Sequence, residues 1–151
     1  MKQIAVLGIL LLIFSGCARV TPVAYSYTNG LAWLKEHLSP QDKILCWTDY
    51  TSLIRSYVGD NHTLDASAQY ALSLALTTDD HTKTIALMQK YNATYLFIAQ
   101  AELQKAERIA HISGTKINDN SLLIIGVRKG EIPGFMIAYM DENVSIYKLR
   151  T

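Results

Sequence analysis

The chain has 151 residues, of which 50% are hydrophobic and 18% charged, and its formal net charge is +1. This length accommodates one domain with a sizeable core but excludes two, because smaller domains bury too little apolar surface. The basic residues are dispersed along the chain rather than clustered, so nucleic acid is excluded as an expected partner.

The first predicted element is an export signal. Met1 and Lys2 precede an apolar run that extends from Ile4 to Phe14, and a basic start before an apolar core is typical of secretory signals. The run is shorter than the roughly 20 residues of a membrane span. Residues 14–17, Phe-Ser-Gly-Cys, resemble a prokaryotic lipobox, which predicts cleavage before Cys17 and lipidation of that residue.

An uncleaved signal anchor that reaches about residue 20 is the alternative. Both interpretations place the protein outside the cytoplasm and anchor it to the cell membrane. We therefore expect a signal over residues 1–17, a linker over 18–28 and a globular domain over 29–151.

The first half of the domain alternates helical and strand patterns. Leu31, Leu34 and Leu38 share one helical face, and Cys46 lies in an apolar strand, where we expect an inert buried thiol. The patterns predict, in chain order, a helix from Asn29 to Leu38, a strand over Lys43–Trp47, a short helix to Val58, a helix over Ala66–Leu76 capped by Asp65, and a helix capped by Thr78 or Asp79 that runs to Tyr91.

Strands follow one another more closely in the second half. Asn92 suits a left-handed helix end, and Asp141–Asn143 suits a hairpin turn. The predicted elements are a strand over Tyr95–Ala99, a helix from Ala101 to about Ile112, a strand over Leu122–Val127, and a hairpin of Phe135–Met140 with Val144–Leu149. This order predicts a single α/β domain with a mixed parallel and antiparallel sheet covered by helices.

Residues 31–50, LAWLKEHLSPQDKILCWTDY, resemble the soluble C-terminal domain of the oligosaccharyltransferase catalytic subunit, most closely its archaeal forms. That family has a helix, a Pro-containing turn, a strand and then the motif W-W-D-Y-G. Trp47, Asp49 and Tyr50 match this motif, whereas Thr48 and Thr51 replace its second Trp and its Gly.

A second segment is similar to the family motif D-x-x-K-x-x-x-M/I. Glu102, Lys105 and Ile109 match it, with Glu in place of Asp. Their spacing places them on one helical face, where a charge pair beside an aliphatic side chain could hold a small amphipathic group such as a threonine side chain. The resemblance extends over residues 29–114 and fades through the later strands.

In the family these two motifs are understood to grip the Ser or Thr of the acceptor sequon. The resemblance implies that Trp47 and Asp49 exchange hydrogen bonds with that hydroxyl and that Ile109 touches its methyl group. It also implies that Lys105 lies near Asp49 and organises the pocket. The candidate peptide-binding residues are Trp47, Asp49, Tyr50, Glu102, Lys105 and Ile109.

Each of these residues also has a purely structural interpretation. Trp47 and Tyr50 could belong to the core, and Asp49 could cap the helix that starts there. Glu102 and Lys105 could form only a solvated pair on one helix. Thr48 lacks the indole of the motif, and losing one partner from such a site typically costs about 1–3 kcal/mol.

The sequence does not support an enzyme. In the family, glycan transfer uses acidic residues and a divalent metal held in loops between many membrane spans, and this chain contains one short apolar segment. Asp79, Asp80 and His81 form its densest acidic and imidazole cluster, but adjacent residues at a helix start point in different directions. We therefore expect neither a metal nor another cofactor.

Three functional hypotheses follow. The first is a membrane-tethered, non-catalytic domain related to the acceptor-recognition domain, which binds extended peptide segments that contain Ser or Thr. The second is a surface lipoprotein that keeps the fold as an interaction scaffold and has lost the pocket. The third is an accessory subunit that completes the acceptor site of a separate multispan membrane glycosyltransferase.

Overall fold

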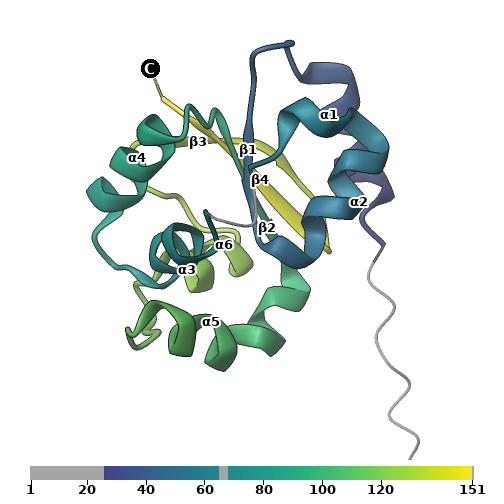
Figure 1. Cartoon of the computed structure of the whole chain (residues 1–151). Coiled ribbons are helices and arrows are strands. Elements are labelled where there is room, and N and C mark those ends of the chain that lie inside the picture. The colour runs from purple at the N-terminus through teal and green to yellow at the C-terminus, as the bar shows by residue number, and fades with distance from the viewer. Residues whose placement is uncertain (1–25, 65–67, 151) are drawn as a thin grey trace, which may run out of the picture.

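A computed structural model describes residues 26–64 and 68–150 of the chain. Four strands form one mixed sheet in the order β1-β2-β4-β3 (Figure 1). The parallel strands β1 and β2 pair with Ile44 opposite Tyr95, and β4 pairs antiparallel with both β2 and β3. The strands are β1 (Ile44–Cys46), β2 (Tyr95–Ala99), β3 (Phe135–Met140) and β4 (Val144–Leu149).

Six α-helices and two short 3-10 helices connect and cover these strands in the described residues. None of the described helices combines the length and apolarity that a membrane crossing requires. The α-helices are α1 (Thr28–His37), α2 (Thr48–Val58), α3 (Gln69–Thr77), α4 (His81–Lys90), α5 (Ala106–Ser113) and α6 (Leu122–Val127), and the 3-10 helices are η1 (Asp60–His62) and η3 (Gln100–Lys105).

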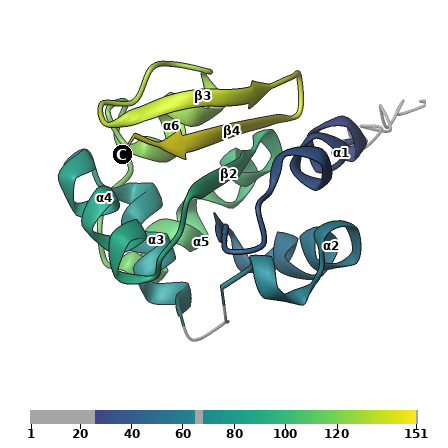
Figure 2. The same ribbon diagram turned by 90° about the horizontal axis from the view of Figure 1, so that it is seen from above.

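Helices α1 and α6 lie on opposite faces of the sheet. A side chain at Gly30 in α1 would collide with Val144, and the Ser145 hydroxyl donates to the carbonyl of Gly126 in α6 at 2.9 Å. Adjacent residues of a strand point to opposite faces, so these two contacts define the two sides of β4. Figure 1 shows α1 and α6 on either side of the strands, and Figure 2 shows the β3–β4 hairpin along one edge of the sheet.

The sheet forms the centre of the core. All residues of β1 and β2 are buried, as expected of strands that are covered on both faces. Their apolar runs, Ile-Leu-Cys and Tyr-Leu-Phe-Ile-Ala, therefore show no alternation of polar and apolar residues. The candidate site residues follow directly after the carboxyl ends of these two buried strands.

The structure confirms the α/β class, the mixed sheet and the strands at 95–99, 135–140 and 144–149. The predicted strand over Leu122–Val127 is wrong, because these residues form helix α6. A short buried apolar run fits either a strand or a helix by periodicity. Packing decides here, since α6 places Gly126 directly against Ile98 of β2.

One predicted helix boundary also changes, and another is confirmed. The N-cap of α4 is Asp80 rather than Thr78 or Asp79, and its carboxylate accepts a hydrogen bond from the Thr82 amide at 3.1 Å. Asn92 has a φ of 53° and ends that helix as expected. The predicted signal, Cys17 and the predicted cap Asp65 lie outside the described residues.

Candidate functional site

The two motif segments meet at one edge of the sheet. Strand β1 ends at Cys46 and leads into Trp47 and Asp49, whereas β2 ends at Ala99 and leads into the segment that carries Lys105. Because β1 and β2 are parallel neighbours, their carboxyl ends lie side by side. Ligands of α/β proteins commonly bind at this edge of the sheet.

An ion pair joins the two segments. The ammonium Nζ of Lys105 lies 2.6 Å from Oδ2 of Asp49, and the two residues are 56 positions apart. The side chains are 33% exposed for Lys105 and 35% for Asp49, so solvent reaches both. The same ammonium lies 5.1 Å from the ring centroid of Tyr50, a distance at which an aromatic face attracts a cation.

The remaining candidate residues are buried. Trp47, Glu102 and Ile109 are 0% exposed and Tyr50 is 5% exposed. Contact of Trp47 or Ile109 with a ligand therefore requires local opening of the site. Asp49 and Lys105 are the solvent-accessible members of this set of residues.

Buried polar atoms of the candidate residues that lack a hydrogen-bond partner among the described residues include the indole Nε1 of Trp47 and the carboxyl Oε2 of Glu102. The other carboxyl oxygen of Glu102 accepts a hydrogen bond from the Ala99 amide at 3.2 Å. Buried polar groups without partners are rare because each carries an uncompensated desolvation cost.

The environment shifts the pKa values of several groups in this cluster. Burial raises the pKa of Glu102 to about 8, and the nearby Asp49 adds to the shift. Burial also raises the pKa of the Cys46 thiol to about 12, and burial together with the neighbouring Tyr27 raises the pKa of Tyr50. Low accessibility to water disfavours the charged form of all three groups.

Two structural interpretations of these residues are wrong. Asp49 lies in the first turn of α2 but does not cap it, because the N-cap position is Trp47 and no side-chain cap bond forms. Glu102 and Lys105 do not form a solvated pair, since Glu102 is buried and bonds Ala99 while Lys105 pairs with Asp49. Trp47 and Tyr50 do belong to the core.

The segment that carries Glu102, Lys105 and Ile109 is not one regular α-helix. It begins as the 3-10 helix η3 and continues as α5. Glu102 and Ile109 nevertheless face the core, and Lys105 lies at its margin. Glu102 and Ile109 therefore belong to the interior, whereas Lys105 lies at the solvent side.

The replaced motif positions have modest roles. Thr48 begins α2 and is half-buried. The hydroxyl of Thr51 lies 3.8 Å from the Cys46 sulfur. Neither side chain provides the flat apolar surface of the indole that the family motif has at the first of these positions.

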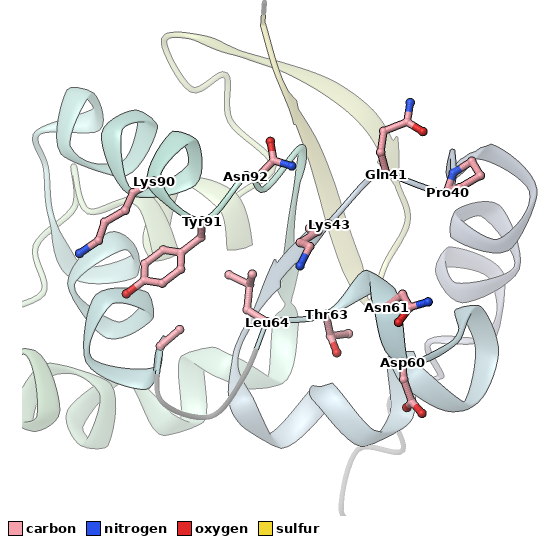
Figure 3. Close-up of a pocket in the computed structure, with 11 residues that line it drawn as sticks. Pro40, Gln41, Lys43, Asp60, Asn61, Thr63, Leu64, Lys90, Tyr91 and Asn92 are labelled. Atoms are coloured by element: carbon pink, nitrogen blue, oxygen red, sulfur yellow. The ribbon is translucent and has the colours of Figure 1, made fainter.

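A polar groove that the sequence did not reveal lies at the other end of the same strands. It has a volume of about 780 Å³, and its lining includes Lys43, Asn61 and Asn92 (Figure 3). Lys43 precedes β1 and Asn92 lies just before β2. The sequence indicates only helix and strand boundaries at these positions, and the groove forms because these residues converge in space.

Comparison with solved structures identifies the fold. The C-terminal globular domain of an oligosaccharyltransferase from Archaeoglobus fulgidus superposes with a TM-score of 0.69 and 17% sequence identity, over 82% of this chain and 96% of that domain. A second structure of such a domain from the same organism gives a TM-score of 0.61 and 17% identity, over 82% of this chain and 94% of that domain.

No protein-family model and no curated protein matches the chain. The similarity is therefore carried by the arrangement of helices and strands. The chain has the fold of the C-terminal globular domain of archaeal oligosaccharyltransferase.

Proposed function

We propose that this protein is a non-catalytic recognition domain that binds extended peptide segments containing Ser or Thr at the carboxyl edge of β1 and β2. The observation that carries the proposal is the contact between Asp49 and Lys105, which joins the two motif segments into one polar surface. The fold, shared with the oligosaccharyltransferase domain, supports it.

The chemistry of the pair suits a hydroxyl-bearing side chain. The Asp49 carboxylate has more acceptor positions than Lys105 occupies, so it can also accept a hydrogen bond from a peptide hydroxyl or backbone amide. Hydrogen bonds to a charged acceptor are stronger than neutral ones. Lys105 orients the carboxylate through its short contact.

The unpaired buried indole supports recognition that involves local opening. Trp47 Nε1 is a buried donor without a described partner, so a ligand acceptor that reaches it would remove a desolvation cost. Ile109 is also fully buried and, after such an opening, would offer an apolar contact to a threonine methyl group.

We also propose that the domain is tethered to the outer side of the cell membrane. The apolar run before Cys17 supports a signal that ends in a lipidated cysteine, and a diacylglycerol would supply the two chains that lasting attachment needs. Metabolic labelling with a fatty acid, compared between the native chain and Cys17→Ser, tests this part. Equal labelling of the two proteins would contradict it.

Peptide titration tests the recognition site. The ¹⁵N-labelled full chain is titrated with an Asn-x-Thr peptide and with an Asn-x-Ala control, and chemical shifts are followed by NMR. We expect shifts at Asp49, Lys105 and the Trp47 indole with the Thr peptide alone. Asp49→Asn should abolish them, whereas Asp119→Asn, at an exposed ion pair with Arg128, should not.

Equal responses to both peptides, or none to either, would contradict the recognition site. That result would favour the interaction scaffold with a lost pocket. Co-purification with a multispan membrane protein, dependent on Asp49, would instead favour the accessory subunit.

A further inference from the structure

The groove at the amino ends of β1 and β2 has the size of a ligand site. Its volume is about 780 Å³, within the roughly 300–1,000 Å³ of typical ligand pockets. Its walls come from the turn before β1, from η1 and from the end of α4. Figure 3 shows Lys43 in the middle of the groove, with Tyr91 and Leu64 on one side and Asn61 on the other.

The polar side chains around the groove are not engaged with one another. Among the described residues, the side chains of Gln41, Lys43, Asp60, Asn61 and Asn92 make no hydrogen bond or ion pair. Their hydrogen-bonding capacity is therefore available to a ligand. The three amides each offer donors and an acceptor, which is the combination that a peptide backbone requires.

The backbone around these groups is held in place. The Arg55 side chain donates to the Thr63 hydroxyl at 2.7 Å, and Thr63 forms a parallel bridge with Ile44. On the other wall, the amide of Thr94 donates to the carbonyl of Lys43 at 2.8 Å. A groove whose walls are already ordered loses less conformational entropy on binding.

The charged side chains of the groove favour a ligand that carries a negative charge. Among the described lining residues, Lys43 and Lys90 outnumber the carboxylate of Asp60. The Lys90 ammonium lies 5.5 Å from the ring centroid of Tyr91. The Lys43 ammonium is thus the cation without a partner among the described lining residues. A ligand carboxylate beside it would form a charge-assisted hydrogen bond.

We propose that this amino-end groove binds a short, extended peptide segment that carries an acidic side chain. The ligand carboxylate pairs with Lys43, the peptide backbone bonds the amides of Asn61 and Asn92, and Asp60 accepts a backbone amide. The site is distinct from the Asp49 and Lys105 surface, since it lies at the opposite ends of the two strands. It does not depend on the function proposed above.

Titration with matched peptides tests the groove in the full chain. The probe is Ac-Gly-Asp-Gly-Asp-Gly-NH2, and its control replaces both Asp residues by Asn. We expect NMR shifts at the amides of Lys43, Asn61 and Asn92 with the acidic peptide only. Lys43→Gln should weaken binding by about two- to fivefold, the range for a partly exposed ion pair, whereas Lys116→Gln on another surface should not.

Three outcomes would overturn the proposal. In the first, the Asn control peptide binds as tightly as the acidic peptide. In the second, Lys43→Gln and Asn61→Ala both bind the acidic peptide as tightly as the native chain does. In the third, glucuronate, a carboxylate-bearing sugar, binds at the same residues more tightly than the peptide. Asn61→Ala keeps the test valid if Lys43→Gln fails to fold. Asp49→Asn separates the two sites, because it should affect the Thr peptide and leave the acidic peptide unchanged.

Discussion

The carboxyl group of Glu102 accepts a hydrogen bond from the backbone amide of Ala99 at 3.2 Å while remaining 0% exposed. The bond connects η3 to the last residue of β2, and η3 begins at the next residue. The second carboxyl oxygen of Glu102 has no partner among the described residues. A neutral carboxyl group tolerates this environment better than a carboxylate, because desolvation penalises the charged form.

The first prediction is that the stability of the folded protein depends on pH through Glu102. Because the pKa of Glu102 rises from 4.5 to about 8 in the folded protein, the native state holds a proton that the unfolded chain has lost. Its contribution to stability is thus complete below pH 4.5 and is lost as the pH rises to about 8. The slope within this window approaches about 1.4 kcal/mol per pH unit.

Glu102→Gln is the test, since its amide stays neutral and its carbonyl can keep the Ala99 bond. Urea unfolding of both proteins at about pH 5 and about pH 8 gives the difference in unfolding free energy. We expect the variant to gain stability relative to the native chain as the pH rises. A difference that stays constant between the two pH values would show that Glu102 ionises normally.

The second prediction concerns the Asp49 and Lys105 pair. Both side chains are about one-third exposed, so solvent screens their attraction. A double-mutant cycle with Asp49→Asn and Lys105→Met should give a coupling free energy of about 0.2–1 kcal/mol, measured by urea unfolding. Strictly additive effects would mean that the pair does not form in solution.

The third prediction concerns the packing of α6 on the sheet. A Cβ atom added at Gly126 would overlap Cδ1 of Ile98. Overpacking of this kind costs about 1–3 kcal/mol, more than the roughly 1 kcal/mol by which alanine favours a helix over glycine. Gly126→Ala should therefore lower the unfolding free energy.

Ile98→Val removes the colliding methyl group and supplies the control. In the Ile98→Val background, Gly126→Ala should cost less than it does alone, as measured by urea unfolding. An equal loss of unfolding free energy in both backgrounds would show that the strain does not arise from contact with the Ile98 methyl group.

The fourth prediction concerns the buried hydroxyl of Ser121. It donates to the carbonyl of Thr77 at 2.8 Å and accepts from the amide of Asn118 at 2.9 Å. Ser121→Ala leaves both groups without this partner and should cost about 1–3 kcal/mol of unfolding free energy.

Ser56→Ala is the matched control, because the exposed Ser56 hydroxyl donates to the carbonyl of Leu53 in its own helix. Ser56→Ala should lower the unfolding free energy, measured for both variants by urea unfolding, much less than Ser121→Ala does. Comparable losses in the two variants would argue against a special role for the buried hydroxyl.

Local sequence patterns determined much of the secondary structure. Strand β2 and the β3–β4 hairpin follow from apolar runs bounded by turn residues, and Asn92 ends α4 because it tolerates a left-handed conformation. The family resemblance also singled out Asp49 and Lys105, and the structure brings them into contact. The secondary-structure elements, unlike this contact between residues 56 positions apart, depend on residues close together in the chain.

Tertiary structure decided the conformation of residues 122–127 and the geometry of both candidate sites. Residues 122–127 form a helix rather than a strand because they pack on β2, which their uniformly apolar composition could not specify. The contact of Asp49 with Lys105 and the groove around Lys43 exist only once β1 and β2 pair in parallel. Such sites combine side chains from distant segments, so their geometry and burial depend on strand pairing that no local pattern encodes.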